Sequence, residues 1–429
     1  MNKTKVYLDH SASTPMDKNV LKAMEPYFSE KYGNPSSIHG FGQEAIAGVD
    51  QAREQVANFL NCEPSEVIFT SGATESDNLA IKGIMKGLMK QGMKKERMHI
   101  ITSLVEHDAI LEPLAEKVQQ GIEVTYLPVD KSGVVDLEKL KKSIKDNTVL
   151  VSVMYVNSEV GSIQPIREIG KIIKKINAKK LNEWKKMRTK SRGAKPQPIY
   201  FHTDATQALN FLPCDTKKLH VDMVSLSGHK IYGPKGVGVL YVKTGVPLKA
   251  VQLGGHHEGN LRSGTLNVPG IVGLGAAVNQ LKTKTQKHKN TKTQLYKNNW
   301  AGDNKKIAKL RDKLVEGITK AVPDVVLNTD RSVSTPAHAH FTFLGVEGES
   351  VLIALDMKGI AVSTGSACAS GSLKASHVIL AMGIKKEIAH NSIRFSLGKH
   401  NTEADIERVI KVLPGIIKKL REMNPLYGK

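Results

Sequence analysis

The stretch SLSGHKIYGPKGVGVLYV, Ser225–Val242, places a lysine between two apolar runs. Val221–Leu226 reads as a buried strand and the second apolar run as its neighbour, so Lys230 is expected on a turn at a strand end. A lysine that forms an imine with a carbonyl cofactor needs such a rigid, partly desolvated place, because it must lose its proton. Ser227 and His229 flank it with a hydroxyl and an imidazole, which suit a phosphate. A solvated surface lysine is the alternative.

Short apolar runs alternate with helical patterns before this stretch. The predicted strands are Glu66–Thr70, His99–Ser103, Glu123–Leu127, Val149–Tyr155 and Ile199–Thr203. Such alternation is typical of an α/β fold with a mostly parallel sheet, whose ligands lie at the carboxyl ends of the strands. The chain from Ile307 onward reads as a smaller α+β domain. We therefore expect a segment, residues 1–15, that packs with the small domain, a large domain, residues 16–265, and a small domain, residues 266–429.

Three polar residues follow the predicted strands, namely His107, Asn157 and Asp204. A carboxylate such as Asp204 can keep the pyridine nitrogen of pyridoxal phosphate protonated, which makes that ring an electron sink. Gln207 could bond the phenolic oxygen of the ring, and His107 could stack on the ring and move protons. Each residue alone is more often a turn residue or a hydrogen-bonded core residue.

The segment Ser71–Glu75 follows a predicted strand and opens a helix that reaches about Met93. A strand, a turn of small residues and a helix N-terminus form a natural phosphate site, because free backbone N–H groups face the anion. Thr74 could add its hydroxyl. The alternative is an ordinary helix cap formed by Ser71 or Thr74.

The small domain contains the polar, glycine-rich segment STGSACASGSLKAS, Ser363–Ser376. Cys368 is therefore expected on an exposed, mobile loop, where a thiol is a candidate nucleophile. Arg394, on a predicted strand further on, could hold a substrate carboxylate through two hydrogen bonds.

Composition narrows the class of protein. With 429 residues, 40% of them apolar, the chain can bury a full core, and no signal or membrane segment is recognised. Its three cysteines form no paired spacing, which favours a reducing, intracellular compartment. The net charge of +21 comes largely from lysine-rich segments at residues 171–195 and 282–306, which solvated faces explain better than nucleic-acid binding does. His256 and His257 lack a third ligand and are expected to be loop residues rather than metal ligands.

Together these motifs resemble the pyridoxal-phosphate-dependent cysteine desulfurases of the class V aminotransferase fold, in particular the branch that serves iron–sulfur cluster assembly. The matching motifs, in order, are YLDHSASTP, GNPSSIHGFG, TSGATESDN, EHDAI, NSEVGSIQPI, HTDATQ, SLSGHKIYGPKG, RSGTLNVPGIVG, STGSACAS and IRFSLGKHNT. Only the two lysine-rich segments fall outside the resemblance.

The resemblance implies a role for each matching residue. Lys230 would be the Schiff-base lysine, and Asp204 would pair with the pyridinium nitrogen. Cys368 would take the sulfur of L-cysteine as a persulfide, release alanine, and transiently ligate a nascent cluster shared with a scaffold protein. The other implied site residues are the phosphate ligands Ala73, Thr74, Ser227 and His229, the ring contacts His107, Asn157 and Gln207, the substrate ligands Arg394 and Asn34, and Thr265, which would reach the cofactor of a partner subunit.

The resemblance further implies a cytoplasmic homodimer that passes sulfur to an iron–sulfur scaffold and, as a second outlet, to sulfur carriers for tRNA thiolation. Ser158, Lys399 and the GGHHEGN segment depart from the usual family pattern, and none of them is required by the chemistry. Two alternatives stay open at this point. One is a selenocysteine lyase or aminotransferase of the same fold, and the other is a non-catalytic sulfur-relay or nucleic-acid-binding protein.

Overall fold

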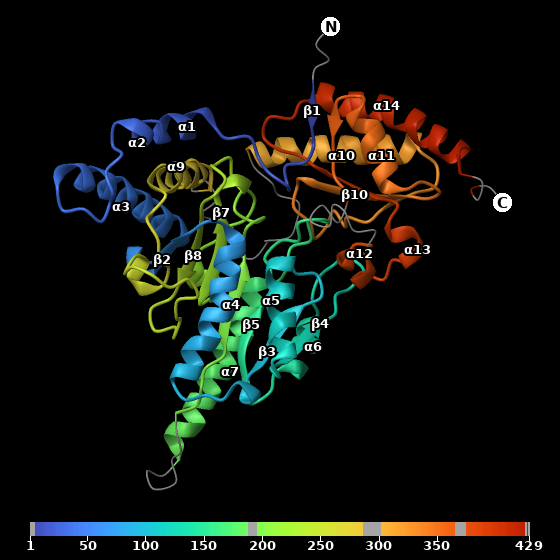
Figure 1. Ribbon diagram of the computed structural model, residues 1–429. Coiled ribbons are helices and arrows are strands. Elements are labelled where there is room, and N and C mark those ends of the chain that lie inside the picture. The colour runs from blue at the N-terminus through green and yellow to red at the C-terminus, as the bar shows by residue number, and fades with distance from the viewer. Residues whose placement is uncertain (1–4, 188–194, 286–301, 365–374, 425–426, 428–429) are drawn as a thin grey trace.

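A seven-stranded sheet forms the centre of the larger part of the molecule (Figure 1). The computed structural model describes residues 5–187, 195–285, 302–364, 375–424 and 427, without the side chains of residues 282–285. Across the sheet the strands are ordered β2 (Val67–Thr70), β8 (Gly238–Val242), β7 (Met223–Ser227), β6 (Tyr200–Asp204), β5 (Thr148–Ser152), β3 (His99–Ser103) and β4 (Glu123–Leu127). β8 is antiparallel to both of its neighbours, and all other pairs are parallel. The carboxyl ends of β2, β7, β6, β5 and β3 therefore share one edge.

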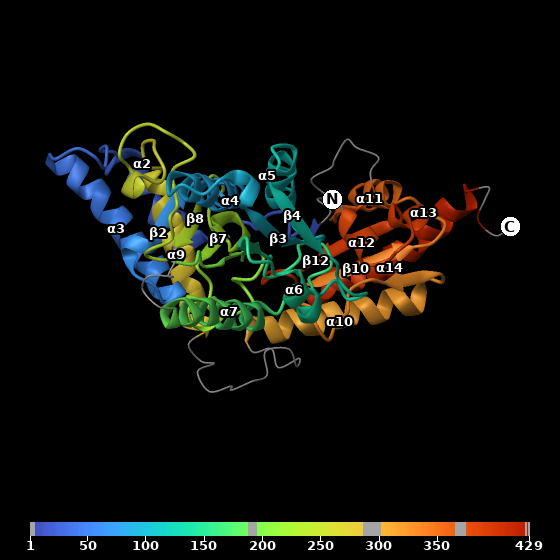
Figure 2. The ribbon, with the colours of Figure 1, turned by 90° about the horizontal axis from the view of Figure 1, so that it is seen from below.

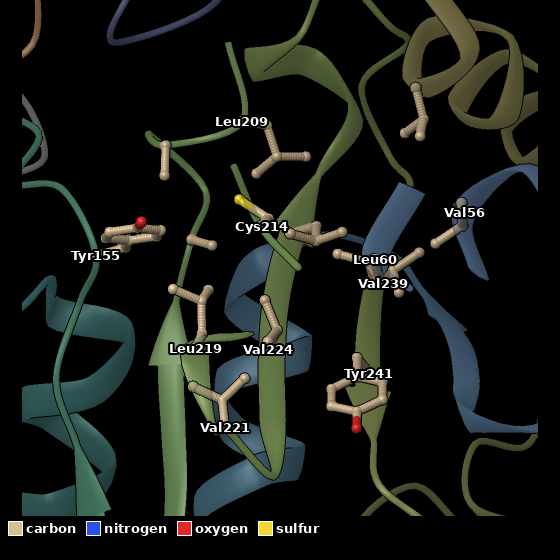
Figure 3. Packing of buried hydrophobic residues seen from close by; sticks show 14 of the residues in the cluster. Val56, Leu60, Tyr155, Leu209, Cys214, Leu219, Val221, Val224, Val239 and Tyr241 are labelled. Atoms are coloured by element: carbon tan, nitrogen blue, oxygen red, sulfur yellow. The ribbon is translucent and has the colours of Figure 1, made fainter. Parts of the chain in front are cut away.

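Helices cover both faces of this sheet. They are α3 (Gly40–Leu60), α4 (Ala73–Lys90), α5 (Asp108–Gln119), α6 (Leu137–Ser143), α7 (Ile166–Lys186), α8 (Thr216–Leu219) and α9 (Val268–Thr285). Apolar side chains alternate between the faces, as in β2, where Ile68 packs with α4 while Val67 and Phe69 pack with α3 and α9. Figure 3 shows part of the hydrophobic core on the face of the sheet that α3 and α9 cover, with Val56 and Leu60 of α3 close to Val239 of β8.

A second, smaller sheet is antiparallel, with strand order β12 (Ser392–Ser396), β10 (His338–Phe343) and β9 (Val325–Leu327). Its core is closed by α10 (Asp303–Ala321), α11 (Gly348–Asp356) and α14 (Glu403–Glu422). The N-terminal strand β1 (Val6–Tyr7) pairs with β11 (Ile360–Ala361), and Val6 and Leu8 are buried in this same core. The N-terminal segment thus packs with the small unit.

The shorter elements complete the chain. They are α1 (Lys18–Met24), α2 (Pro26–Ser29), α12 (His377–Ala381), α13 (Lys386–Ala389) and the 3₁₀ turns Pro64–Glu66, Lys95–Arg97, Gly228–Lys230 and Glu258–Asn260. Pro26 separates α1 from α2, because it lacks the N–H that would continue α1 and instead begins α2. None of the described helices is long and apolar enough to cross a membrane.

The α/β fold with a mostly parallel large sheet and a smaller α+β unit is confirmed, and so is the pairing of the strands on either side of Lys230. The boundary expected at residue 266 does not follow the packing. Six apolar residues of α9, from Val268 to Leu281, are buried in the core of the large sheet, against α3. We infer that the large domain extends through α9.

Candidate active site

Lys230 lies in the 3₁₀ turn that directly follows β7, where the sequence places it. Its side chain is half-buried, and its Nζ donates hydrogen bonds to the carbonyl oxygens of Ser11 and, at 3.0 Å, Ala12. The turn is tight, because a Cβ on Gly228 would come within 2.8 Å of the Pro234 carbonyl oxygen. The backbone therefore fixes where this lysine leaves the sheet.

The N-terminal segment covers the lysine, which the sequence did not predict. Gln207 donates from Nε2 to the Ser11 carbonyl at 2.9 Å, and Thr14 donates its hydroxyl to the His229 carbonyl at 2.8 Å. These contacts join residues more than 190 positions apart. The YLDHSASTP motif marks this segment in the sequence, but nothing in the motif predicts that the segment contacts Lys230.

Asp204 ends β6, the parallel neighbour of β7, and so lies beside the lysine turn. One carboxylate oxygen accepts the Thr206 N–H at 2.9 Å, and Asp204 is 8% exposed. Two further buried carboxyl groups, Glu106 and Asp77, lie close enough for the charge of Asp204 to act on them. Burial raises the pKa of Glu106 to about 8, although Ser103 and the Met154 N–H donate to it. Sequence reasoning missed both carboxyl groups, because nothing in their motifs separates a buried acid from an exposed one.

The N-terminus of α4 presents the backbone N–H groups of its first turn close to the end of β2. Its cap residue is Gly72, without a side-chain cap, so neither Ser71 nor Thr74 is the ordinary cap that the sequence left open. Ala73 and Thr74 are the first two residues of the helix, and its dipole favours an anion there. Gly238 begins β8 against this turn, since a Cβ on it would fall 2.6 Å from the Gly72 carbonyl carbon. The end of this helix suits a phosphate.

The two flanking residues of Lys230 differ in exposure. Ser227 is buried at the end of β7, and His229 is half-buried, with Nδ1 3.3 Å from the Ser13 hydroxyl. Burial, and next the Lys230 charge, lower the pKa of His229 to about 4. At neutral pH His229 is therefore an uncharged imidazole, which can donate a hydrogen bond to an anion but offers it no positive charge.

His107 and Asn157 follow neighbouring strands of the sheet, β3 and β5. His107 caps α5, where its Nδ1 accepts the Ala109 N–H at 3.1 Å, so Nε2 carries the proton. Asn157 is buried, and its side-chain amide forms hydrogen bonds with the backbone. Nδ2 donates to the Val105 carbonyl, and Oδ1 accepts the N–H groups of Glu159 and Val160. Asn157 thus holds together the two loops that end these strands.

Arg394 lies in the middle of β12 and is 3% exposed. Its Nη2 pairs with the Asp9 carboxylate at 2.7 Å, and Nη1 donates to the Ser158 carbonyl at 3.0 Å. Its Nε is buried without a hydrogen-bond partner among the described residues. Its backbone pairs with Ser363, which lies five residues before Cys368. Cys368 itself lies outside the described residues, and with it the expected nucleophile and cluster ligand.

Asn34 and Thr265 are not brought to Arg394. Asn34 is exposed between α2 and α3, where it accepts the Ser36 N–H. In Figures 1 and 2 these helices lie at the opposite end of the molecule from β10 and β12. Within one chain Asn34 and Arg394 therefore lie in different parts of the molecule, and the role of Asn34 as a substrate ligand stays a prediction. Thr265 is exposed on the loop before α9.

The glycine-rich loop before Thr265 is anchored by charge. Glu258, buried, accepts two hydrogen bonds from Arg53 at 2.6 and 3.0 Å and one from the Phe69 N–H of β2 at 2.7 Å. His256 bonds Asn260, and His257 accepts the Gly264 N–H. In the parts of the chain that the structure describes, no three His, Cys, Asp or Glu side chains are grouped to hold a metal.

The residues present fit pyridoxal phosphate. An uncapped helix N-terminus provides phosphate donors, a half-buried lysine lies at a strand end, and the adjacent strand ends in a carboxylate. These groups converge on the sheet edge where α/β folds bind ligands.

A family model described as aminotransferase class V matches residues 6–181 and 184–409. The chain belongs to this family, and within it to the cysteine desulfurases. A cysteine desulfurase IscS of Clostridium botulinum is 45% identical over 429 residues, all of this chain and 98% of the relative. The human cysteine desulfurase is 41% identical over 98% of this chain and 84% of its own length. A solved NifS-like protein has 36% identity and a TM-score of 0.82 over 97% of this chain and its whole length. The family is pyridoxal-phosphate-dependent, and so is this protein.

Proposed function

We propose that this protein converts L-cysteine to L-alanine and leaves the sulfur as a persulfide on Cys368. The observation that carries the proposal is the placement of Lys230 and Asp204 at the ends of two adjacent parallel strands, beside an uncapped helix N-terminus. The cysteine desulfurases to which the chain is similar over its whole length support the same reaction. A selenocysteine lyase or aminotransferase has less support from the segment STGSACAS, because an aminotransferase has no use for the thiol of Cys368.

The residues of the site divide the work. Ala73, Thr74, Ser227 and His229 would bind the phosphate, and Asp204 would pair with the ring nitrogen while His107, Asn157 and Gln207 hold the ring. Bound pyridoxal phosphate supplies an electron sink for the bonds of the substrate α-carbon. Lys230 would hold the cofactor through Nζ. Once the substrate has taken its place on the cofactor, Lys230 would move the proton of the substrate α-carbon. To do so it must leave the carbonyl groups of Ser11 and Ala12.

Sulfur transfer falls to Cys368, with Arg394 binding the substrate carboxylate. The Cys368 thiolate would attack the sulfur of the substrate, so that a sulfur–sulfur bond forms and the carbon–sulfur bond breaks. The electron pair of the broken bond stays with the substrate β-carbon, which a proton then converts to the methyl group of alanine. A scaffold protein for iron–sulfur clusters would receive the persulfide sulfur, and Cys368 would transiently ligate the cluster that forms on it. Sulfur carriers for tRNA thiolation are a second acceptor. The cytoplasmic location stays a prediction from the sequence.

A homodimer is supported by exposed apolar residues around α2 and α3. Phe28, Tyr32, Ile38 and Phe41 are all exposed, Ile38 by 94%, and the rings of Tyr32 and Phe41 lie 5.6 Å apart. The yellow loop before α9, which carries Thr265, lies at the same end of the molecule (Figures 1 and 2). In a dimer built on this end, Thr265 and Asn34 would serve the partner's site. Ile38→Asp should produce a monomer in light scattering, whereas Met357→Asp, at the exposed residue that caps the C-terminus of α11, should leave the dimer intact.

The central test measures alanine and sulfide released from L-cysteine with a thiol reductant. Wild type should release both in equal amounts, and Lys230→Ala and Cys368→Ala should each lose activity. Cys62→Ala is the matched control, because burial raises the pKa of that thiol to about 12 and keeps it unreactive. Full sulfide release by Cys368→Ala would overturn the proposed sulfur route, and no release by a yellow wild type would overturn the proposed substrate.

A further inference from the structure

A buried polar layer lies behind Asp204, between the sheet and α4. Asp77 of α4 is 1% exposed and His202 of β6 is fully buried, with 3.6 Å between Asp77 Oδ1 and His202 Nε2. His202 and Asp204 are two residues apart on one strand, so both side chains face α4. Among the described residues neither oxygen of Asp77 has a hydrogen-bond partner. A buried carboxyl group left in this way is costly and calls for a reason.

His202 is held from both sides by hydroxyl groups. Its Nδ1 lies 2.9 Å from Ser152 of β5, and its Nε2 lies 2.9 Å from Ser225 of β7. Three adjacent strands thus contribute to one polar row directly below the ends that carry Lys230 and Asp204. An apolar row would pack this interior at lower cost, so the row is expected to serve the site above it.

Burial shifts the pKa values of the titratable groups in and beside this polar layer. Burial, and next the Asp204 charge, raise the pKa of Asp77 well above its ordinary range, against a weaker effect of the Ser225 hydroxyl. Burial lowers the pKa of His202 to about 3. Glu106, on the far side, is also protonated at neutral pH. Two ionised carboxylates in such a site repel each other, which disfavours the charged form of Asp77.

We propose that Asp77 is a positioning residue for Asp204, acting as a neutral carboxylic acid that provides a buried hydrogen-bond donor without adding a second negative charge. The donor can turn to the hydroxyl and imidazole groups of the row, whose His202 lies directly below Asp204 on the same strand. This inference rests on the proposed function, because it assigns Asp204 to the ring nitrogen of the cofactor.

The test compares Asp77→Asn with Asp77→Leu in the cofactor-loaded protein. Asn keeps the shape, the neutrality and the donor, whereas Leu keeps only the volume. The readout is the pH at which the absorbance band of the bound cofactor titrates. Asp77→Asn should titrate as wild type does, and Asp77→Leu should titrate at least about one pH unit higher, because a weakened Asp204 leaves less positive charge on the ring. An Asn shift as large as the Leu shift, or a folded Leu variant without a shift, would overturn the proposal.

Asp204→Asn separates this inference from the function beneath it. If Asp204→Asn shifts the band and Asp77→Leu does not, only the role of Asp77 is rejected. If Asp204→Asn leaves the titration unchanged, the proposed role of Asp204 fails, whatever Asp77 does.

A second measurement needs no Leu variant and no cofactor. The titratable groups that face Asp77 are His202 and Asp204 from β6 and Glu106 from the loop after β3. A folded state that keeps Asp77 protonated loses stability as the pH rises above the ordinary carboxyl range, because the unfolded chain releases the proton earlier. The unfolding midpoint of cofactor-free wild type should therefore fall more steeply from pH 5 to 8 than that of Asp77→Asn. Parallel curves would show that Asp77 is ionised in the fold and would overturn the proposal.

Discussion

Arg394→Lys is expected to raise the KM for L-cysteine by roughly 10- to 150-fold. Two guanidinium nitrogens are already engaged, by Asp9 and by the Ser158 carbonyl, and Nε is the buried nitrogen of the group that has no hydrogen-bond partner among the described residues. Lysine can keep the ion pair with Asp9, but its single nitrogen cannot also present a donor at the position of Nε. The loss is one charge-assisted hydrogen bond to the substrate carboxylate, about 1.5–3 kcal/mol. Because that carboxylate does not change during the reaction, kcat should change much less.

The assay is alanine formation over a range of cysteine concentrations, with the cofactor absorbance recorded to show that the site is loaded. Arg421→Lys is the matched control, since Arg421 is also a buried arginine of the small unit and donates to the Leu344 and Asp324 carbonyls. Its KM should stay at the wild-type value. An unchanged KM for a folded, loaded Arg394→Lys would refute the reasoning and leave Arg394 as a structural partner of Asp9.

Three further predictions concern stability and the cofactor. Glu106→Gln should flatten the pH dependence of unfolding in cofactor-free protein: the folded-state pKa is raised from 4.5 to about 8, so the stability that Glu106 contributes is present below about pH 4.5 and is lost as the pH rises through about 8. Glu258→Gln, which weakens the buried ion pair of the glycine-rich loop, should cost about 1–3 kcal/mol in thermal or urea unfolding, whereas Glu123→Gln, in an exposed and solvent-screened pair, should cost much less. Gly238→Ala should weaken cofactor binding, measured by fluorescence titration, because its Cβ would displace the turn before α4, and Gly415→Ala, in open space in α14, should not.

The large sheet could be predicted because its strands are short, apolar on both faces and separated by helices. That pattern belongs to a parallel sheet buried on both sides, and it fixes which residues follow a strand. Lys230 and Asp204 could therefore be assigned to one edge of the sheet from the sequence alone. The place of α9 could not, because an apolar helix fits the core of either domain equally well. Its small residues indicate close packing but not against which partner.

The residues that cover the site were not predictable from local patterns. The bonds of Lys230 to Ser11 and Ala12 span about 219 and 218 positions, and a polar turn near the N-terminus carries no sign of where it folds back. In the sequence Asp77 is an ordinary polar position in a helix, yet its burial, and next the charge of Asp204, raise its pKa. Such effects depend on distance and exclusion of water, which only the assembled fold supplies.

The N-terminal segment joins both cations of the site, and this has a consequence for how ligands bind. Ser11 and Ala12 accept from Lys230, while two residues earlier Asp9 pairs with Arg394. The same short segment is tied to β12, since Ser396 accepts the His10 N–H and its hydroxyl accepts the Ser11 N–H. The positive charges of Lys230 and Arg394 thus both have partners in the N-terminal segment. A cofactor that takes Lys230 and a substrate that takes part of Arg394 both act on this one segment, and through it on the contact between the two sheets. Binding of one is therefore expected to change the affinity for the other.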